Sequence, residues 1–237
     1  MSNHTMAKDN NRYAALEQDQ TDTTTSESSE TPSSQAQQNT IAEHPRAKCV
    51  PGPGEHVLQY TYSVWFAKKP QGAQRSAVNY EQSIKLVGSF CTVEQFWHLY
   101  SYMNRPNDLG NNVDIHVFKD GIRPMWEDDA NKHGGKWIVR LRKGLAARCW
   151  ENVIMAMLGE QFMVGDEMCG AVLSVRYQED IISVWNRTSS DTGITNRIRD
   201  TMSRACTLPT NTIMEYKAHT HSLRDNSSYR NTDVFVR

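Results

Sequence analysis

The sequence predicts an α+β fold in which one antiparallel sheet carries helices on a single face. Two observations indicate this fold class. Short strand-like segments recur along the chain with three amphipathic helices among them, which is typical of helices packed on one side of an antiparallel sheet. The chain has 237 residues, of which 38% are hydrophobic. That is enough for one well-buried domain and too little for two large ones.

Seven segments have the apolar alternation, or the aromatic and β-branched content, of strands. They are Tyr60–Phe66, Ile115–Phe118, Trp137–Arg142, Ala171–Arg176, Ile181–Trp185, Thr212–Tyr216 and Val234–Val236. Along 136–142 the alternation places Trp137, Val139 and Leu141 on one face, and the other face carries Lys136, Ile138, Arg140 and Arg142. The polar run 177–180 between two strand segments predicts a hairpin.

Three segments have helical periodicity. They are Thr92–Met103, Ala146–Leu158 and a third that begins at Asp191 or Ile194 and ends at Cys206. Thr92 and Gln95 have the spacing of a capping box at the start of the first helix. Gly159 is expected to end the second helix.

The edge of the first helix has two interpretations. Its core stripe contains Phe96 and Tyr100, and Val93 and Trp97 lie beside that stripe. These two side chains are either peripheral core or, together with Met155 of the second helix, an exposed apolar ledge that suits a partner helix.

The first 51 residues are expected to be a separate, disordered tail. They are rich in Ser, Thr and Gln and have almost nothing to bury, so burial cannot offset the entropy of ordering them. The Pro-Gly run at 51–54 marks the boundary, and the predicted domain spans 52–237. The polar sequence from about residue 220 predicts a partly flexible loop before the last short strand.

Composition excludes several classes of function. The formal net charge of −1 excludes polybasic binding of nucleic acid as the dominant mode. No apolar run approaches the length of a membrane span, and no secretory signal is recognised. Five dispersed Cys without a C-x-x-C pair indicate thiols in a reducing, cytoplasmic compartment and no metal site. Motifs of hydrolases, nucleotide-binding loops and zinc proteases are missing, so neither an enzyme nor a cofactor is expected.

Trp126 is the first candidate for a recognition residue. It lies in a loop bounded by Gly and Pro and followed by three acids, and a Trp in such a loop is less often core. Glu127 is either a solvated acid or, beside a stacking ring, an acceptor for two N–H groups of a guanine edge. The basic face of 136–142, joined by Arg176, is either a solvated sheet face or a phosphate-binding strip.

Several segments carry a family likeness. They are HVLQYTYSVWF, TVEQFWHLY, FKDGIRPMWEDDANKHGGKW, MLGEQF and CGAVLSVR. Together they resemble the cap-binding translation initiation factor 4E family over residues 55–219, in the order that the family has them. The segments LRKGL, CWEN, QEDII and IMEYK are most similar to the repressor-type, class II members.

The resemblance implies a curved antiparallel sheet of about eight strands with three helices on its convex face. It implies that the concave side stacks the 7-methylguanosine cap of mRNA between Tyr80 and Trp126, while Glu127 binds the guanine edge. The implied cap-binding residues are Tyr80, Trp126, Glu127, Arg176, Trp185, Lys136 and Arg224. Among these, Trp185 would touch the N7-methyl group and Arg224 would lie in a tail loop over the phosphates.

The resemblance also implies a monomer with a dorsal surface for proteins that carry a Tyr-x-x-x-x-Leu-apolar helix. That surface comprises His56, Val57, Leu58, Gln59, Val93, Trp97, Asn152, Met155 and Gly159. Helical periodicity independently places four of them, Val93, Trp97, Asn152 and Met155, off the core stripes.

The chain departs from the general initiation factors at informative positions. The resemblance implies that the general factors carry Trp at the position of Tyr80. Trp is a better cation–π ring than Tyr, so weaker cap binding is expected for this chain. The resemblance also implies Leu-Glu in the general factors at the positions of Glu151 and Asn152. The first hypothesis is therefore a cap-binding repressor that competes with the general factor. The alternatives are an initiation factor for selected mRNAs and an interaction scaffold with a vestigial cap site.

Overall fold

The computed structural model describes residues 49–69 and 83–236. Within them, eight strands form one sheet in which all neighbours pair antiparallel, in the order β2-β1-β3-β5-β6-β4-β7-β8. The strands are β1 (Val57–Lys68), β2 (Ile84–Thr92), β3 (Val113–Lys119), β4 (Gly135–Arg142), β5 (Met168–Val175), β6 (Glu179–Asn186), β7 (Ile213–Ala218) and β8 (Asp233–Val236).

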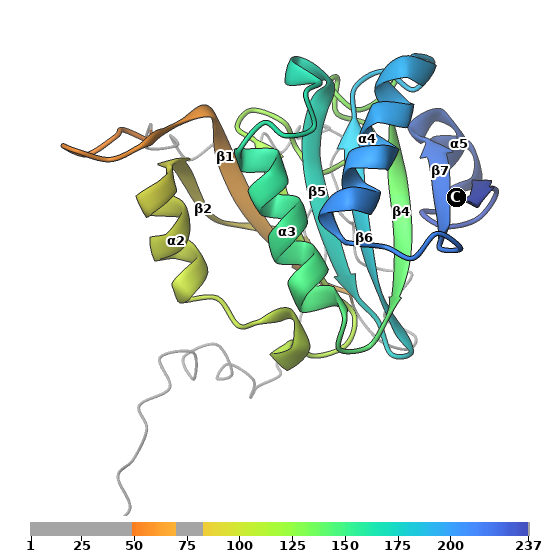
Figure 1. The fold of residues 1–237 in the computed structure, drawn as a ribbon, viewed down its shortest axis with the longest axis horizontal. Helices are drawn as coiled ribbons and strands as arrows, with labels where there is room; N and C mark the ends of the chain where they lie inside the picture. Colours follow the sequence, from red (N-terminus) through yellow and green to blue (C-terminus); the bar gives the residue numbers. More distant parts are fainter. Residues whose placement is uncertain (1–48, 70–82, 237) are drawn as a thin grey trace, which may run out of the picture. The chain divides into compact units, whose positions relative to one another are not determined.

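Three helices lie on one face of this sheet, as Figure 1 shows. They are α2 (Val93–Ser101), α3 (Ala146–Leu158) and α4 (Thr192–Ala205). Helix α2 lies against β2, α3 lies against β5 and β6, and α4 lies against β4 and β6. A further helix, α5 (His219–Asp225), contacts β7, and two 3₁₀ turns occur at Pro106–Asp108 and Gly165–Glu167. The predicted fold class is confirmed, with α5 as an addition.

The main core lies between the three helices and the sheet. Strand alternation supplies one side, with Trp137 and Val139 of β4 facing the helices, and α3 supplies Trp150 and Ile154 on the other. All four side chains are almost completely buried. The stripe of α3 therefore falls where its sequence predicts, because apolar side chains at helical spacing can be buried together only on the face toward the sheet. The alternate strand positions face the opposite side of the sheet.

The start of α2 confirms half of the predicted capping box. The Thr92 hydroxyl accepts a hydrogen bond from the backbone N–H of Gln95 at 3.1 Å. The Gln95 side chain does not close the box. Its amide donates to Glu55 at 2.8 Å, and its carbonyl accepts from the backbone N–H of Cys91 at 3.1 Å. Gln95 thereby ties the chain before β1 to the start of α2.

Two elements differ from the sequence predictions. Strand β2 is not predicted, because it is an edge strand whose Leu86 and Val87 are both exposed, so its apolar residues do not alternate. The loop predicted after residue 220 is wrong for 219–225, which form helix α5. This short polar helix is held by burial of His219 and Ser222, a tertiary effect without a local sequence signal. The last strand is present as predicted.

Some sequence predictions fall outside the described residues. These include the disordered tail, so its disorder stays a prediction. In the described part of the chain, no helix has both the length and the apolar character needed to cross a bilayer. All five Cys are free thiols, and four of them are buried.

Candidate functional site

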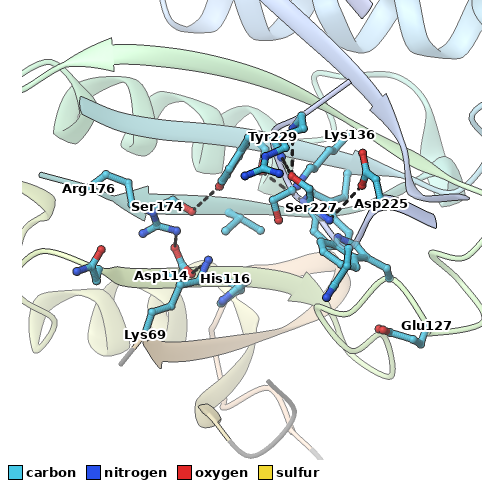
Figure 2. Close-up of a pocket in the computed structure, with 18 residues that line it drawn as sticks. Lys69, Asp114, His116, Glu127, Lys136, Ser174, Arg176, Asp225, Ser227 and Tyr229 are labelled. Atoms are coloured by element: carbon cyan, nitrogen blue, oxygen red, sulfur yellow. Dashed lines mark hydrogen bonds and ion pairs between the residues drawn. The ribbon is translucent and has the colours of Figure 1, made fainter. Parts of the chain in front are cut away.

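A cavity of about 770 Å³ opens on the sheet face opposite the main core. Its floor is made by the alternate strand positions that the helices do not cover, among them His116, Lys136, Ser174 and Trp185. The loop after β3 contributes Trp126 and Glu127, and the segment Asp225–Arg230 forms a wall from the C-terminal side. Figure 2 shows these side chains converging from separate elements.

The loop that carries Trp126 and Glu127 is fixed by internal hydrogen bonds. The buried Asn131 amide donates to the backbone carbonyls of Arg123 and Met125, both at 2.8 Å. The Asp128 carboxylate accepts from the backbone N–H of Arg123 at 3.0 Å. Asp128 and Asn131 therefore shape the loop, and they hold the ring and the Glu127 carboxylate at the mouth of the cavity.

Trp126 is half-buried and Glu127 is exposed. The Trp126 ring packs against the second apolar cluster, which includes Phe118 and Trp185. In Figure 2 the Glu127 carboxylate is directed from the loop toward the other cavity residues. It makes no hydrogen bond or ion pair with the part of the chain that the structure describes, so both of its oxygens can accept hydrogen bonds from a ligand.

Trp185 forms part of the cavity floor. It is only 4% exposed, and it contacts Phe118 edge-on at 5.3 Å between ring centroids. The ring of His219, the first residue of α5, lies 4.2 Å from the Trp185 ring between centroids. The unpredicted helix therefore has a role at the site, because it packs a ring against Trp185.

Arg176 is held by a buried carboxylate. Its Nη2 atom lies 2.5 Å from Oδ1 of Asp114, and Nη1 donates to the backbone carbonyls of Val113 and Val175. Lys69 Nζ lies 3.3 Å from Oδ2 of the same Asp114. Burial alone would raise the pKa of Asp114, but attraction to Lys69 and Arg176 outweighs it and the pKa is lowered. The cationic end of the cavity is thus built around one anion.

Lys136 is the buried cation of the floor, with 2% exposure. Its Nζ atom lies 5.4 Å from the ring centroid of Trp185 and 4.9 Å from that of Tyr229. Burial, together with repulsion from Lys69 and Lys217, lowers the pKa of Lys136 to about 7. This ammonium therefore titrates near neutral pH.

The C-terminal wall is anchored to the floor. The Tyr229 hydroxyl hydrogen-bonds the hydroxyl of Ser174 at 3.1 Å, and the Tyr229 ring lies under Lys136 and Arg140. Lys217 of β7 donates to Asp225 at 2.8 Å and to the backbone carbonyl of Arg230. These contacts hold the segment after α5 against the cavity.

The predicted cap-binding residues divide into three groups. Trp126, Glu127, Lys136, Arg176 and Trp185 all line the cavity. Tyr80 lies outside the described residues. Arg224 was expected in a tail loop, and this placement is wrong, because Arg224 lies on helix α5, is exposed and does not line the cavity. Arg230 supplies the guanidinium of that segment.

The two interpretations of the basic strip apply to different residues. Lys136 and Arg176 line the cavity, whereas Arg140 is paired with Glu179 at 2.6 Å and with Glu215 at 2.8 Å. Arg142 is exposed and does not line the cavity.

The predicted partner surface lies on the helix side of the sheet. Val93 is 39% exposed and Trp97 is 46% exposed, so neither is a core side chain, and the partner site itself stays a prediction. Met155 is half-buried, and Val57 is exposed on β1. His56 is fixed next to the ledge, because its backbone N–H and its Nδ1 atom both bond Glu94, at 2.8 and 2.6 Å.

Most of the residues that line the cavity were not predicted from the sequence. Asp114, His116 and Tyr229 are three of them. Asp114 and His116 alternate along β3, and this alternation was the one signal that could have placed them on the same face as Phe118. Tyr229 gave no signal, since its contacts with the floor are distant in sequence, Ser174 being 55 residues away.

Comparison with known proteins places these features in context. The family model for eukaryotic initiation factor 4E matches residues 57–234. Eukaryotic translation initiation factor 4E-4 of Caenorhabditis elegans is 51% identical over 181 residues, covering 76% of this chain and 85% of that protein. Eukaryotic translation initiation factor NCBP of Arabidopsis thaliana is 50% identical over 179 residues, with coverages of 76% and 80%.

Solved structures show the same likeness. C. elegans eIF4E-3, in complex with the 4E-binding protein Mextli and a cap analog, matches with a TM-score of 0.68 and 33% identity. The match covers 76% of this chain and 99% of that chain. Ascaris suum eIF4E-3 with an m7G cap matches with a TM-score of 0.67 and 33% identity, covering 76% and 98%.

Proposed function

Because this chain belongs to the eukaryotic initiation factor 4E family, we propose that its cavity binds the 7-methylguanosine cap of mRNA and that the protein represses translation by competing for the cap with the general factor. Members of this family are cap-binding factors and not enzymes. The observation that carries the proposal is the convergence of Trp126, Glu127 and Trp185 with two cations, Lys136 and Arg176, around one cavity.

The chemistry of these side chains suits a methylated guanine. N7-methylation gives the base a positive charge, and an electron-rich ring such as Trp126 gains cation–π energy as well as stacking from such a base. The carboxylate of Glu127 can accept the two N–H groups of the guanine edge. Lys136 and Arg176 offer charge to the phosphates that follow. Unmethylated guanine lacks the charge, so it should bind more weakly.

Retention on a resin that carries 7-methyl-GTP tests cap binding. The native protein should be retained and should elute with free 7-methyl-GTP but not with GTP. Trp126→Ala should pass through. Tyr177→Ala is a matched control, because Tyr177 is an aromatic residue that is 81% exposed and lies outside the cavity. Retention of Trp126→Ala equal to that of the native protein would contradict the proposal.

The repressor role is supported by two side chains beside the ledge. Glu151 accepts hydrogen bonds from Tyr100, at 3.0 Å, and from Arg105. The Asn152 amide donates to the backbone carbonyl of Ala205 at 2.9 Å. The Leu-Glu pair expected at these two positions in the general factors would offer a partner an apolar side chain and a carboxylate. Here both side chains are engaged within the chain, and such a change alters which partners bind.

A cell-free translation reaction distinguishes a repressor from an initiation factor. Added native protein should lower translation of a capped reporter mRNA and leave an uncapped reporter unchanged, and Trp126→Ala should lose this effect. Stimulation of the capped reporter in an extract depleted of its own cap-binding factor would favour the alternative, an initiation factor for selected mRNAs. The relatives in C. elegans and A. thaliana are both named translation initiation factors, which supports that alternative.

We further propose that the protein acts as a cytoplasmic monomer and that its ledge binds a Tyr-x-x-x-x-Leu-apolar helix. The ledge supports this proposal because Val93 and Trp97 are exposed apolar side chains beside a fixed strand start. Light scattering of the purified chain tests the monomer, and imaging of a tagged copy tests the compartment. A dimer mass or a nuclear signal alone would overturn the respective statement.

A further inference from the structure

His116 is a buried polar side chain that the site as described leaves unused. It belongs to β3, is 2% exposed and lines the cavity. Neither of its ring nitrogens has a hydrogen-bond partner among the described residues. An unsatisfied buried polar group costs free energy, and its presence in a folded protein calls for an explanation. Its position on the cavity face makes a bound ligand the natural partner.

The surroundings of His116 decide its charge. The neighbours across the sheet are Trp65 on β1 and Val172 on β5, and the ring of Phe118 lies 6.4 Å away. The charged groups that face it are Asp114, Lys69, Arg176 and Lys136. Burial lowers the pKa of His116 to about 4; the three cations also lower it, while Asp114 raises it. At neutral pH the ring is therefore uncharged, with one N–H donor and one free acceptor nitrogen.

We propose that His116 is a ligand-binding residue of the cavity and that one of its ring N–H groups donates to a phosphate oxygen of the bound nucleotide. This inference rests on the proposed cap binding. The base is assigned to Trp126, Glu127 and Trp185, whereas His116 lies two residues from Asp114, the anion that organises the cationic end. Figure 2 draws His116 beside Asp114, on the side toward Glu127, and so between the cationic end of the cavity and the residues assigned to the base.

The charge of the ligand strengthens this interaction. A phosphate chain brings negative charge among Lys69, Arg176 and Lys136, which offsets their repulsion of a protonated imidazole. The same charge favours the protonated ring directly. Ligand binding should therefore raise the pKa of His116, and the donor hydrogen bond should gain charge assistance as it does so.

A series of ligands with increasing numbers of phosphates tests the proposal. The affinities of 7-methylguanosine, 7-methyl-GMP and 7-methyl-GTP are measured for the native protein, for His116→Phe, which keeps a ring and removes the nitrogens, and for His116→Gln, which restores an N–H donor. His133→Phe is the matched control, because His133 is exposed and does not line the cavity.

The proposal predicts a loss that depends on phosphate. His116→Phe should weaken binding of 7-methyl-GTP roughly tenfold and leave 7-methylguanosine unchanged, since hydrogen bonds to charged groups have about this value. His116→Gln should recover part of the loss, and His133→Phe should behave as the native protein. An equal loss for all three ligands would indicate a structural role and overturn the proposal.

A second test uses only the native protein, so its result does not depend on whether the His116 variants fold. Nitrogen-15 resonances of the His116 ring should shift toward the protonated form when 7-methyl-GTP is added and stay in place with 7-methylguanosine. Ring resonances that are unchanged by 7-methyl-GTP overturn the inference while cap binding stands. Failure of the native protein to bind any of the three ligands overturns both proposals.

Discussion

The Nη2 atom of Arg176 lies 2.5 Å from the Oδ1 atom of Asp114, a carboxylate that is 1% exposed. This pair joins β3 to the end of β5, and Lys69 at the end of β1 completes it. Strands β1, β3 and β5 are thereby connected by one buried anion. Arg176 is thus both a candidate ligand for the cap phosphates and a structural residue. The two roles can be separated experimentally.

Asp114→Asn should destabilise the domain. The substitution removes the charge that attracts Arg176 and Lys69 in a partly buried site, and the free energy of unfolding should fall by roughly 2–4 kcal/mol. Asp129→Asn is the control, because Asp129 pairs with Lys132 on the surface at 2.8 Å, where water and salt screen the pair, and its loss should change stability little. Urea denaturation at pH 7 measures both. Equal small losses would show that burial of the pair contributes little.

The same carboxylate makes stability depend on acid. The pKa of Asp114 is lowered in the folded protein, so its stabilisation is fully present above the ordinary pKa of an Asp and is lost as the pH falls below it. The native protein should therefore lose stability below about pH 4. The loss in Asp114→Asn should be smaller over the same range. Urea denaturation at several pH values measures the loss of stability in both proteins. Equal losses in the two would assign the acid sensitivity to other groups.

Cap affinity should fall as the pH rises through neutrality. The pKa of Lys136 is lowered to about 7, so above this pH the empty site must take up a proton to offer a charged ammonium to the phosphates. Affinity for 7-methyl-GTP should fall by up to roughly 25-fold between pH 6.5 and pH 8.5 from this cause. In Lys136→Arg the guanidinium stays charged over this pH range, so any remaining change of affinity reports the titration of the ligand itself. Identical pH profiles for the two proteins would contradict the assignment.

Trp97→Ala should separate the ledge from the cavity. The ring is 46% exposed and touches Phe96 and Tyr100 at its edge, so its loss should leave the fold and the cap affinity largely unchanged. Binding of a peptide with the Tyr-x-x-x-x-Leu-apolar pattern should be lost. Tyr102→Ala, at the end of the same helix and 73% exposed, is the matched control. If the peptide binds Trp97→Ala as tightly as Tyr102→Ala, the ledge is not the partner site.

Trp126→Ala should weaken 7-methyl-GTP binding while the domain stays folded. Stacking of a base on an aromatic ring contributes roughly 1–3 kcal/mol, and the loss should reach at least about fivefold. The hydrogen bonds of Asn131 and Asp128 that shape the loop do not involve the ring, so the loop should persist. Calorimetric titration measures the loss, and the melting temperature checks the fold.

Elements with strong periodicity were predicted well from the sequence. Helix α3 matches its predicted bounds because a continuous apolar stripe and Gly159 define it locally. The face assignment of β4 was also confirmed, since alternation over 137–141 allows one burial pattern. Strand β2 and helix α5 were missed, because an exposed edge strand and a seven-residue polar helix depend on tertiary contacts rather than on local pattern.

The site was predictable only in part. Trp126 and Glu127 could be found because a Trp in a Gly- and Pro-bounded loop is conspicuous in a sequence. His116 could not, because its significance lies in the missing partner for its ring, which is a property of the folded cavity. Tyr229 could not, because contacts over 55 residues leave no local trace. The family likeness added Trp185, which lines the cavity, and Tyr80, which stays a prediction.

A fluorescence titration of the purified protein with 7-methyl-GTP, with GTP as the control, tests the central proposal most directly. Trp126 is half-buried at the cavity, and a stacked methylguanine should quench its emission. Cap binding in this cavity predicts saturable quenching by 7-methyl-GTP at concentrations where GTP has little effect. The affinity for 7-methyl-GTP should be weaker than that of a general initiation factor in the same salt. Equal quenching by the two nucleotides, or none by either, would contradict cap recognition at this site.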